Sequence, residues 1–163
     1  MVCFFVGLGF VKQMLFKRIS LVILLLFPLS ALAEDSIEQE IESIYSDYIE
    51  DFINNDFDGM VSHFQAPTMV RFSDQSTVLE THEIIKEFYR DMKSTIQEGY
   101  AYSKVDKIEV KRATNSIYFA DVNFSRYNSD DELLMAGHMV YFFNNQGGSW
   151  RMFYIENLDQ PLR

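Results

Sequence analysis

The chain has 163 residues and is acidic, with 24 Asp and Glu against 14 Lys and Arg and a formal net charge of −10. Phosphate backbones and anionic membrane surfaces repel a protein with this excess of negative charge, so we expect no nucleic-acid partner. The only cysteine, Cys3, lies near the N-terminus. The rest of the chain therefore has no disulfide, thiolate nucleophile or thiolate metal ligand, and its length suits one domain with a core.

The first 33 residues are typical of a cleavable secretory signal peptide. They contain no Asp or Glu, and Lys17 and Arg18 precede an apolar run from Ile19 to Phe27. The triplet Ala31-Leu32-Ala33 follows, and a basic start, a short apolar stretch and an Ala-x-Ala end define such a signal. A membrane-spanning helix needs roughly 20 apolar residues, about twice the length of this run, so an anchor is disfavoured.

We therefore expect cleavage after Ala33 and a mature domain of residues 34–163 that is periplasmic or secreted, without an integral membrane anchor. Residue 34 is Glu rather than Cys, which does not support a lipid-anchored form. Loss of the basic residues in the leader lowers their number from 14 to 11 and takes the net charge from −10 to −13. Met14 begins a complete signal by itself, and we hypothesise that translation starts there.

The first half of the mature chain is predicted to be mostly helical. Apolar residues recur at three- and four-residue steps from about Ser36 to Asn54, which indicates one amphipathic helix. Asp56 is a suitable N-cap for a short second helix, and Thr81 is one for a third. A short strand is expected between them at Thr68–Phe72, and Gly99 is placed where a C-cap of the third helix is expected.

The second half of the chain is predicted to form four antiparallel strands. Its segments are rich in β-branched and aromatic residues, and short turns rich in Asn, Asp, Ser and Gly separate them. The four segments are Tyr100–Arg112, Ser116–Asn128, Leu133–Asn144 and Ser149–Asn157. Three helices followed by long strands predict an α+β fold, with the helices on one face of a curved sheet.

Several short motifs occur in the mature chain in an order that is similar to that of a known protein family. They are Tyr48, Asn55-Asp56-Phe57-Asp58-Gly59 with Phe64, Ile85-Lys86-Glu87-Phe88-Tyr89, Tyr141-Phe142-Phe143 and Gly148-Ser149-Trp150-Arg151-Met152. This order resembles the nuclear transport factor 2-like superfamily, which includes the SnoaL-like proteins and the ketosteroid isomerases. The resemblance implies a cone-shaped barrel of strongly curved antiparallel sheet packed on three N-terminal helices. It also implies an apolar pocket inside the cone and frequent dimerisation through the sheet.

The resemblance implies that this chain has some of the residues of the ketosteroid-isomerase active site. Tyr48 falls on the tyrosine that donates a hydrogen bond to the developing enolate, and Tyr89 falls on the second tyrosine that supports it. The position of the carboxylate base falls on Phe72, and the position of the protonated acid falls near Met139, so typical ketosteroid-isomerase chemistry is not expected. The candidate ligand-binding residues are Tyr48, Tyr89, Phe72, Met139, Tyr141 and Trp150.

His138 and Asp121 are the candidate replacements for the missing base. The pKa of a histidine lies near neutrality, and a one-residue slip in register turns His138 into the pocket; otherwise it packs on the sheet face. Asp121 is either a buried base in an apolar strand or a solvent-face group paired with Arg126 or a neighbouring lysine. Arg71 binds an anionic ligand if the local register turns it inward, and otherwise it is solvated.

The sequence leaves three functions open. The first is an exported module that binds a small, largely apolar ligand, with Tyr48 and Tyr89 as polar anchors. The second is a lyase or isomerase that transfers a proton next to a carbonyl, and the third is a dimerising or partner-binding module of the cell envelope. The three histidines do not have the tight spacing of metal ligands, so we expect no metal or cofactor. A homodimer is expected from the resemblance.

Overall fold

The computed structural model describes residues 29–72 and 75–158, with side chains from residue 36 onward. The chain divides into two compact units, Met1–Glu34 and Asp35–Arg163. The predicted apolar run of the signal and the alternative start at Met14 lie outside the described residues, and cleavage after Ala33 stays a prediction. Within the described ranges, no helix combines the length and apolar character needed to cross a lipid bilayer.

Three helices lie before the four C-terminal strands, as the sequence predicts. They are α1 (Leu29–Asn54), α2 (Phe57–Ser62) and α3 (His82–Ser94). The helix α1 ends at the predicted residue but begins earlier than Ser36. Its periodic apolar residues face inward, and Ile41, Tyr45 and Phe52 are each at most 4% exposed.

Local side-chain chemistry fixes the ends of the two shorter helices. Asp56 caps α2 by accepting a hydrogen bond from the backbone of Gly59 at 2.9 Å, and Thr81 caps α3 in the same way. The predicted C-cap at Gly99 is wrong, because α3 already ends at Ser94. The Thr95 hydroxyl donates to the carbonyls of the last turn and closes the helix, while Gly99 adopts a φ of +80° in the following turn.

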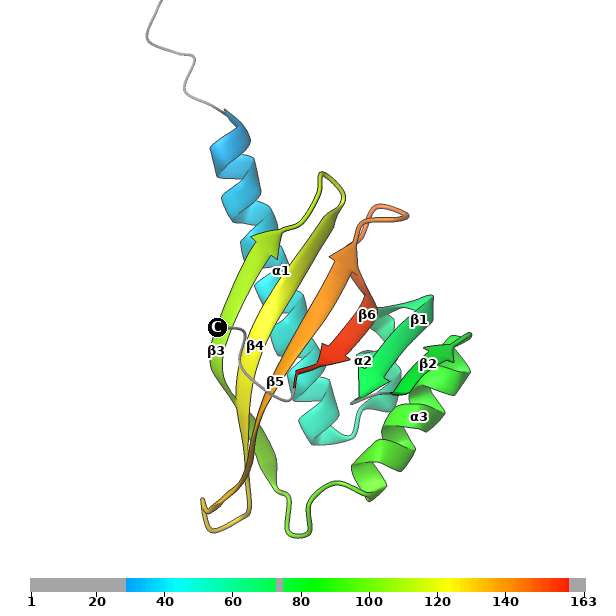
Figure 1. Ribbon diagram of the computed structural model, residues 1–163, viewed down its shortest axis with the longest axis vertical. Helices are drawn as coiled ribbons and strands as arrows, with labels where there is room; N and C mark the ends of the chain where they lie inside the picture. The colour runs from blue at the N-terminus through cyan, green and yellow to red at the C-terminus, as the bar shows by residue number, and fades with distance from the viewer. Residues whose placement is uncertain (1–28, 73–74, 159–163) are drawn as a thin grey trace, which may run out of the picture. The chain divides into compact units, whose positions relative to one another are not determined.

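Six strands form one sheet in the order β2-β1-β6-β5-β4-β3, which Figure 1 shows from right to left. The bounds are β1 Phe64–Phe72, β2 Gln75–Leu79, β3 Tyr102–Arg112, β4 Ile117–Tyr127, β5 Leu133–Asn144 and β6 Arg151–Asn157. All neighbouring pairs are antiparallel except β1 and β6, which run parallel. These two strands are far apart in the chain, so no hairpin forces them into opposite directions.

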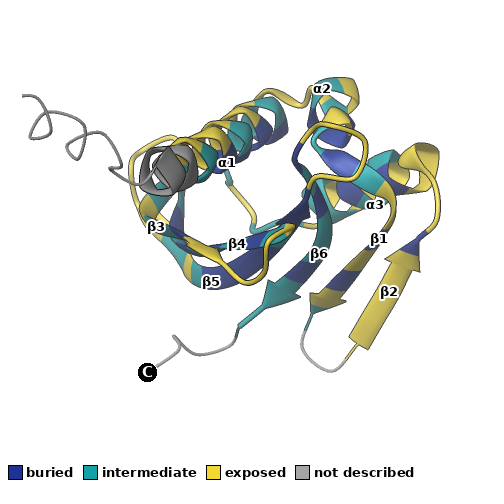
Figure 2. Cartoon of the chain, turned by 90° about the horizontal axis from the view of Figure 1, so that it is seen from above, coloured by how far each residue is buried: buried dark blue, intermediate teal, exposed yellow. Residues whose placement is uncertain are grey.

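The fold class is confirmed, but the sheet does not close into a complete barrel. Its edges are β2 and β3, and Figure 2 shows the sheet curving past the three helices, which lie along its concave side. Alternation along β4 turns Tyr118, Ala120, Val122 and Phe124 inward, and all four are buried. Each large side chain buried in this core contributes roughly 1.5–3 kcal/mol to stability.

Candidate functional site

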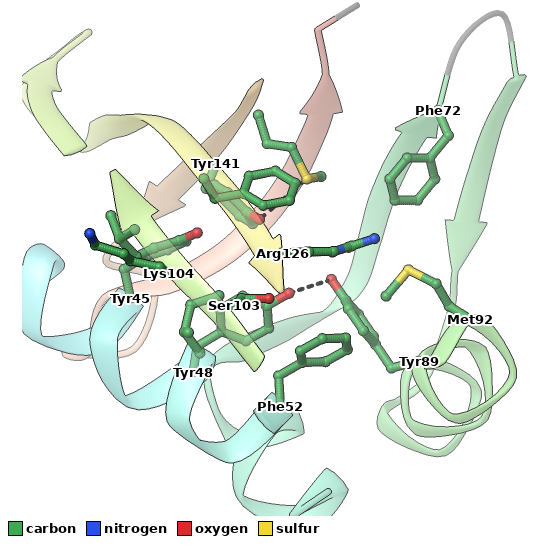
Figure 3. Close-up of a pocket in the computed structure, with 14 residues that line it drawn as sticks. Tyr45, Tyr48, Phe52, Phe72, Tyr89, Met92, Ser103, Lys104, Arg126 and Tyr141 are labelled. Atoms are coloured by element: carbon green, nitrogen blue, oxygen red, sulfur yellow. Dashed lines mark hydrogen bonds between the residues drawn. The ribbon is translucent and has the colours of Figure 1, made fainter. Parts of the chain in front are cut away.

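A cavity of about 40 Å³, which we call the cone cavity, lies among α1, α3 and the concave face of the sheet (Figure 3). Its lining residues are Tyr45, Tyr48, Ile49, Phe52, Phe72, Tyr89, Met92, Ser103, Lys104, Val105, Phe124, Arg126, Met139 and Tyr141. One water needs about 10–15 Å³ of such space, so the cavity holds a few waters or one small polar group. Most of the cone is filled by its own side chains.

Tyr48 of α1 and Tyr89 of α3 meet inside the cone. The Tyr48 hydroxyl donates to the Tyr89 hydroxyl at 3.4 Å, and the two residues are 4% and 2% exposed. Their rings pack edge to face at 6.1 Å, and both also contact the ring of Phe64 at the start of β1. This aromatic packing fixes the direction of both hydroxyls before any ligand arrives.

Two more tyrosines place hydroxyls in the same interior. The rings of Tyr45 and Tyr141 are 4.9 Å apart, and the Tyr141 hydroxyl donates to the sulfur of Met139 at 3.4 Å. The Tyr45 hydroxyl is buried and has no hydrogen-bond partner among the described residues. Burial raises the pKa of all four tyrosines, so their hydroxyls stay protonated at neutral pH and serve as hydrogen-bond donors.

Arg126 is a lining residue that the sequence analysis did not place in the pocket. Its guanidinium donates to the amide oxygen of Gln97 at 3.0 Å and lies 5.2 Å from the centre of the Phe124 ring. Its Nε is buried without a hydrogen-bond partner, and no described carboxylate forms an ion pair with it. The period-two alternation that turns Val122 and Phe124 inward also turns Arg126 inward, and this is the signal that would have found it.

The candidate ligand-binding residues mostly lie together. Phe72, at the end of β1, stacks on Phe88 of α3 at 6.2 Å and lines the cavity, as do Met139 and Tyr141 of β5. Gly137 permits this arrangement, because a Cβ at that position would lie 2.5 Å from the Phe124 ring. Trp150 is not in the lining; it packs edge to face against Tyr118 at 5.1 Å.

His138 and Asp121 lie on the convex face of the sheet, away from the tyrosines. His138 alternates with Met139, whose side chain lines the cavity, so the imidazole points to the other side. Its Nε2 lies 2.5 Å from Oδ1 of Asp121, so Asp121 pairs with His138 and not with Arg126. An open hollow of about 310 Å³ lies beside His138 on this face, bordered by Leu158, the last described residue.

The two other histidines and Arg71 also make contacts outside the cavity. Nε2 of His63 lies 2.9 Å from Oδ2 of Asp51, and Nε2 of His82 lies 3.0 Å from the Phe64 carbonyl oxygen. Arg71 faces the convex side and lies 3.5 Å from the carboxylate of Glu156. In the part of the chain that the structure describes, no three His, Cys, Asp or Glu side chains come together as a potential metal site.

The curved sheet, the three helices on its concave side and the aromatic cavity between them define an NTF2-like domain. The chain belongs to this family: a family model described as "NTF2-like protein (DUF6841)" matches residues 38–160. No curated protein matches the chain significantly.

Solved structures of the same fold show how far the likeness extends. A protein of unknown function with a cystatin-like fold from Nostoc punctiforme has a TM-score of 0.63 at 11% identity, covering 77% of this chain and 90% of its own. An NTF2-like protein from Pseudomonas putida has a TM-score of 0.61 at 14% identity, covering 76% and 86%. Another from Shewanella oneidensis has 0.59 at 12% identity, covering 74% and 98%. At these identities the likeness shows the fold alone.

Proposed function

We propose that this domain binds a small molecule in the cone cavity, with the hydroxyls of Tyr48 and Tyr89 as polar anchors and aromatic side chains around it. The observation that carries the proposal is the meeting of these two hydroxyls, from different helices, in an interior lined mostly by aromatic and aliphatic side chains. Hydroxyl pairs usually lie about 2.7–2.8 Å apart, so their separation of 3.4 Å leaves a weak mutual bond. Both groups therefore retain the capacity to bind a ligand oxygen.

The size of the cavity restricts the ligand. Sites for drug-sized molecules have volumes of about 300–1,000 Å³, far above the 40 Å³ found here. The ligand is therefore either very small or places one polar group in the cavity and its apolar part against half-buried lining residues. Met92 and Phe72 are such residues, and an unbranched methionine side chain adapts readily to a new neighbour.

The lyase or isomerase alternative has less support from the geometry. Proton abstraction next to a carbonyl needs a base within hydrogen-bond reach of the substrate. The described lining contains no Asp, Glu or His, and the buried tyrosines hold their protons. His138 and Asp121 contact each other on the opposite face of the sheet. These contacts support binding in the cavity over proton transfer there.

A second role, self-association through the convex face of the sheet, is favoured by a separate observation. Four half-buried aromatic residues form a cluster there: the ring centres of Phe119, Phe153 and Tyr154 lie 5.4–6.3 Å from that of Phe142. We define these four residues as the convex aromatic cluster. Aromatic clusters on a surface are typical of protein interfaces, and a second copy of the chain fits a two-fold contact through one strand face. Binding and self-association use opposite faces and are compatible.

The proposed binding is tested by screening small carbonyl compounds against the mature domain with a thermal-shift assay, followed by calorimetry. We expect some compounds to bind, and Tyr48→Phe to weaken their binding about fivefold, the usual effect of one lost hydrogen bond. Tyr102→Phe is the matched control, because the Tyr102 hydroxyl donates to Asp131 and neither residue lines the cavity. Binding that is unchanged in Tyr48→Phe, or a screen without any binder, contradicts the proposal.

Because the sequence predicts a signal peptide, we further propose that the domain acts in the periplasm or outside the cell.

A further inference from the structure

We propose that the ligand of the cone cavity carries a carboxylate, and that this group binds the guanidinium of Arg126. The inference rests on the proposed function, since it specifies the chemistry of the same site. It derives from three observations: the kinds of polar group in the lining, the contacts of Arg126, and the size of the cavity.

Every polar side chain in the described lining has at least one hydrogen-bond donor, and two of these side chains are cations. The donors are the four tyrosine hydroxyls, Ser103, Lys104 and Arg126. The described lining contains no acidic side chain, although the chain as a whole has 24 acidic residues against 14 basic ones. Donors and positive charges around a small, mostly apolar space favour an anion there, because the apolar walls strengthen the electrostatic attraction.

The contacts of Arg126 leave its charge without a counterion among the described residues. Its one oxygen partner is the neutral amide of Gln97, and the rings of Phe124 and Tyr100 cover the guanidinium at 5.2 and 6.0 Å. The buried Nε makes no hydrogen bond. A buried N–H without a partner costs free energy, and an Nε with its neighbouring Nη forms the two-pronged edge that matches the two oxygens of a carboxylate.

The charge of Arg126 acts on the same interior space as the tyrosines. Burial raises the pKa of Tyr141, and the positive charge of Arg126 acts in the opposite direction. A carboxylate bound to the guanidinium therefore comes close to the hydroxyl donors. A volume of about 40 Å³ accommodates this head group, while the apolar remainder of the ligand contacts Phe72 and Met92.

The second candidate for anion binding, Arg71, differs from Arg126 in both placement and partner. It faces the convex side and lies 3.5 Å from the carboxylate of Glu156. The two arginines therefore provide a matched pair, because Arg71→Met and Arg126→Met remove the same charge from the protein but only the second changes the cavity. Methionine keeps much of the length and the apolar character of the arginine stem.

The test is a calorimetric titration of the mature domain with acetate, hexanoate, benzoate and phenylacetate, and with the primary amide of each. We expect the best carboxylate to bind on the order of ten- to one-hundred-fold more tightly than its amide, the usual range for hydrogen bonds to charged groups. Arg126→Met is expected to remove this preference, and Arg71→Met is expected to retain it. The comparison of acid with amide in the unaltered protein needs no variant, so it stays valid if Arg126→Met fails to fold.

The outcomes separate the inference from the proposed function. Amides that bind as tightly as their acids overturn the carboxylate inference but leave binding in the cavity intact. A preference for acids that survives in Arg126→Met, or that is lost equally in Arg71→Met, also overturns the inference. If neither acids nor amides bind, both the inference and the proposed function are contradicted.

Discussion

Four buried tyrosines, Tyr45, Tyr48, Tyr89 and Tyr141, supply most of the polar side chains in the described lining of the cone cavity. Their rings contact one another at centre distances of 4.9–6.1 Å. Burial raises the pKa of each hydroxyl because the low-dielectric interior disfavours the charged phenolate. The folded protein therefore holds protons that the unfolded chain, with tyrosine pKa values of about 10, releases in alkaline solution.

We predict that the free energy of unfolding falls as the pH rises above about 10. Above this value the folded state binds more protons than the unfolded state, so rising pH favours unfolding. Tyrosinate absorbance and circular dichroism, recorded along one alkaline titration, check this. We expect the buried tyrosines to ionise only as ellipticity is lost. Ionisation of all nine tyrosines in a protein that keeps its ellipticity would contradict the account.

The residues of the site differ in how far the sequence predicts them. The family resemblance predicts the places of Tyr48 and Tyr89. Both residues lie on amphipathic helices, so small errors in the predicted helix boundaries do not change which way they face. His138 could not be placed, since a shift of one residue in strand register moves a side chain to the other face of the sheet. One of the sequence-based alternatives for Asp121 pairs it with Arg126 on the solvent face, although the alternation of β4 places these two residues on opposite faces.

At the scale of elements, α2 depends on its neighbours for stability. It has six residues, and an isolated helix of that length is not stable in water. Asp56 caps it, and His63, directly after it, contacts Asp51 of α1 at 2.9 Å. Gly59 permits the close approach to α1, because a Cβ there would lie 2.8 Å from Oδ2 of Asp51.

We predict that Gly59→Ala destabilises the domain by about 1–3 kcal/mol, the usual cost of overpacking. Helix propensity alone predicts the opposite sign, since alanine favours a helix over glycine by about 1 kcal/mol. Urea denaturation measures the change. In an Asp51→Ala background, the carboxylate nearest to the added Cβ is absent, so we expect Gly59→Ala to cost less there. A Gly59→Ala protein that is more stable than the unaltered one would refute this account of α2.

The elements that the sequence predicts best are those determined by local chemistry. The end of α1, both N-caps and β5 lie where their residue patterns place them. The sequence pattern does not predict strand β2, because this edge strand has four exposed residues and lacks a hydrophobic alternation. The parallel pairing of β1 with β6 depends on tertiary contacts between distant segments, which no local pattern specifies.

At the scale of the whole domain, the two faces of the sheet have different roles in the proposed function. The concave face and the helices enclose the cone cavity, and the convex face carries the convex aromatic cluster together with the His138–Asp121 pair. The outcome of each proposal can therefore be measured separately.

We predict that the domain forms dimers in sedimentation velocity experiments and that Phe153→Asp weakens them at least tenfold, because it places a charge in the convex aromatic cluster. Leu133→Asp is the control, since Leu133 is 59% exposed and lies outside the cluster. Circular dichroism of each variant shows whether the fold is retained. If the unaltered protein sediments as a monomer at every concentration, self-association through the convex face is ruled out.

The most direct test of the central claim uses methionine methyl groups labelled with ¹³C as reporters in nuclear magnetic resonance spectra. Met92 and Met139 line the cone cavity, whereas Met69 lies on the convex side of β1 and is 36% exposed. On saturation with the tightest-binding carboxylate of the calorimetric series, we predict chemical-shift changes at Met92 and Met139 and none at Met69. Unchanged Met92 and Met139 signals at saturation would place the bound molecule elsewhere and contradict a binding site in the cone.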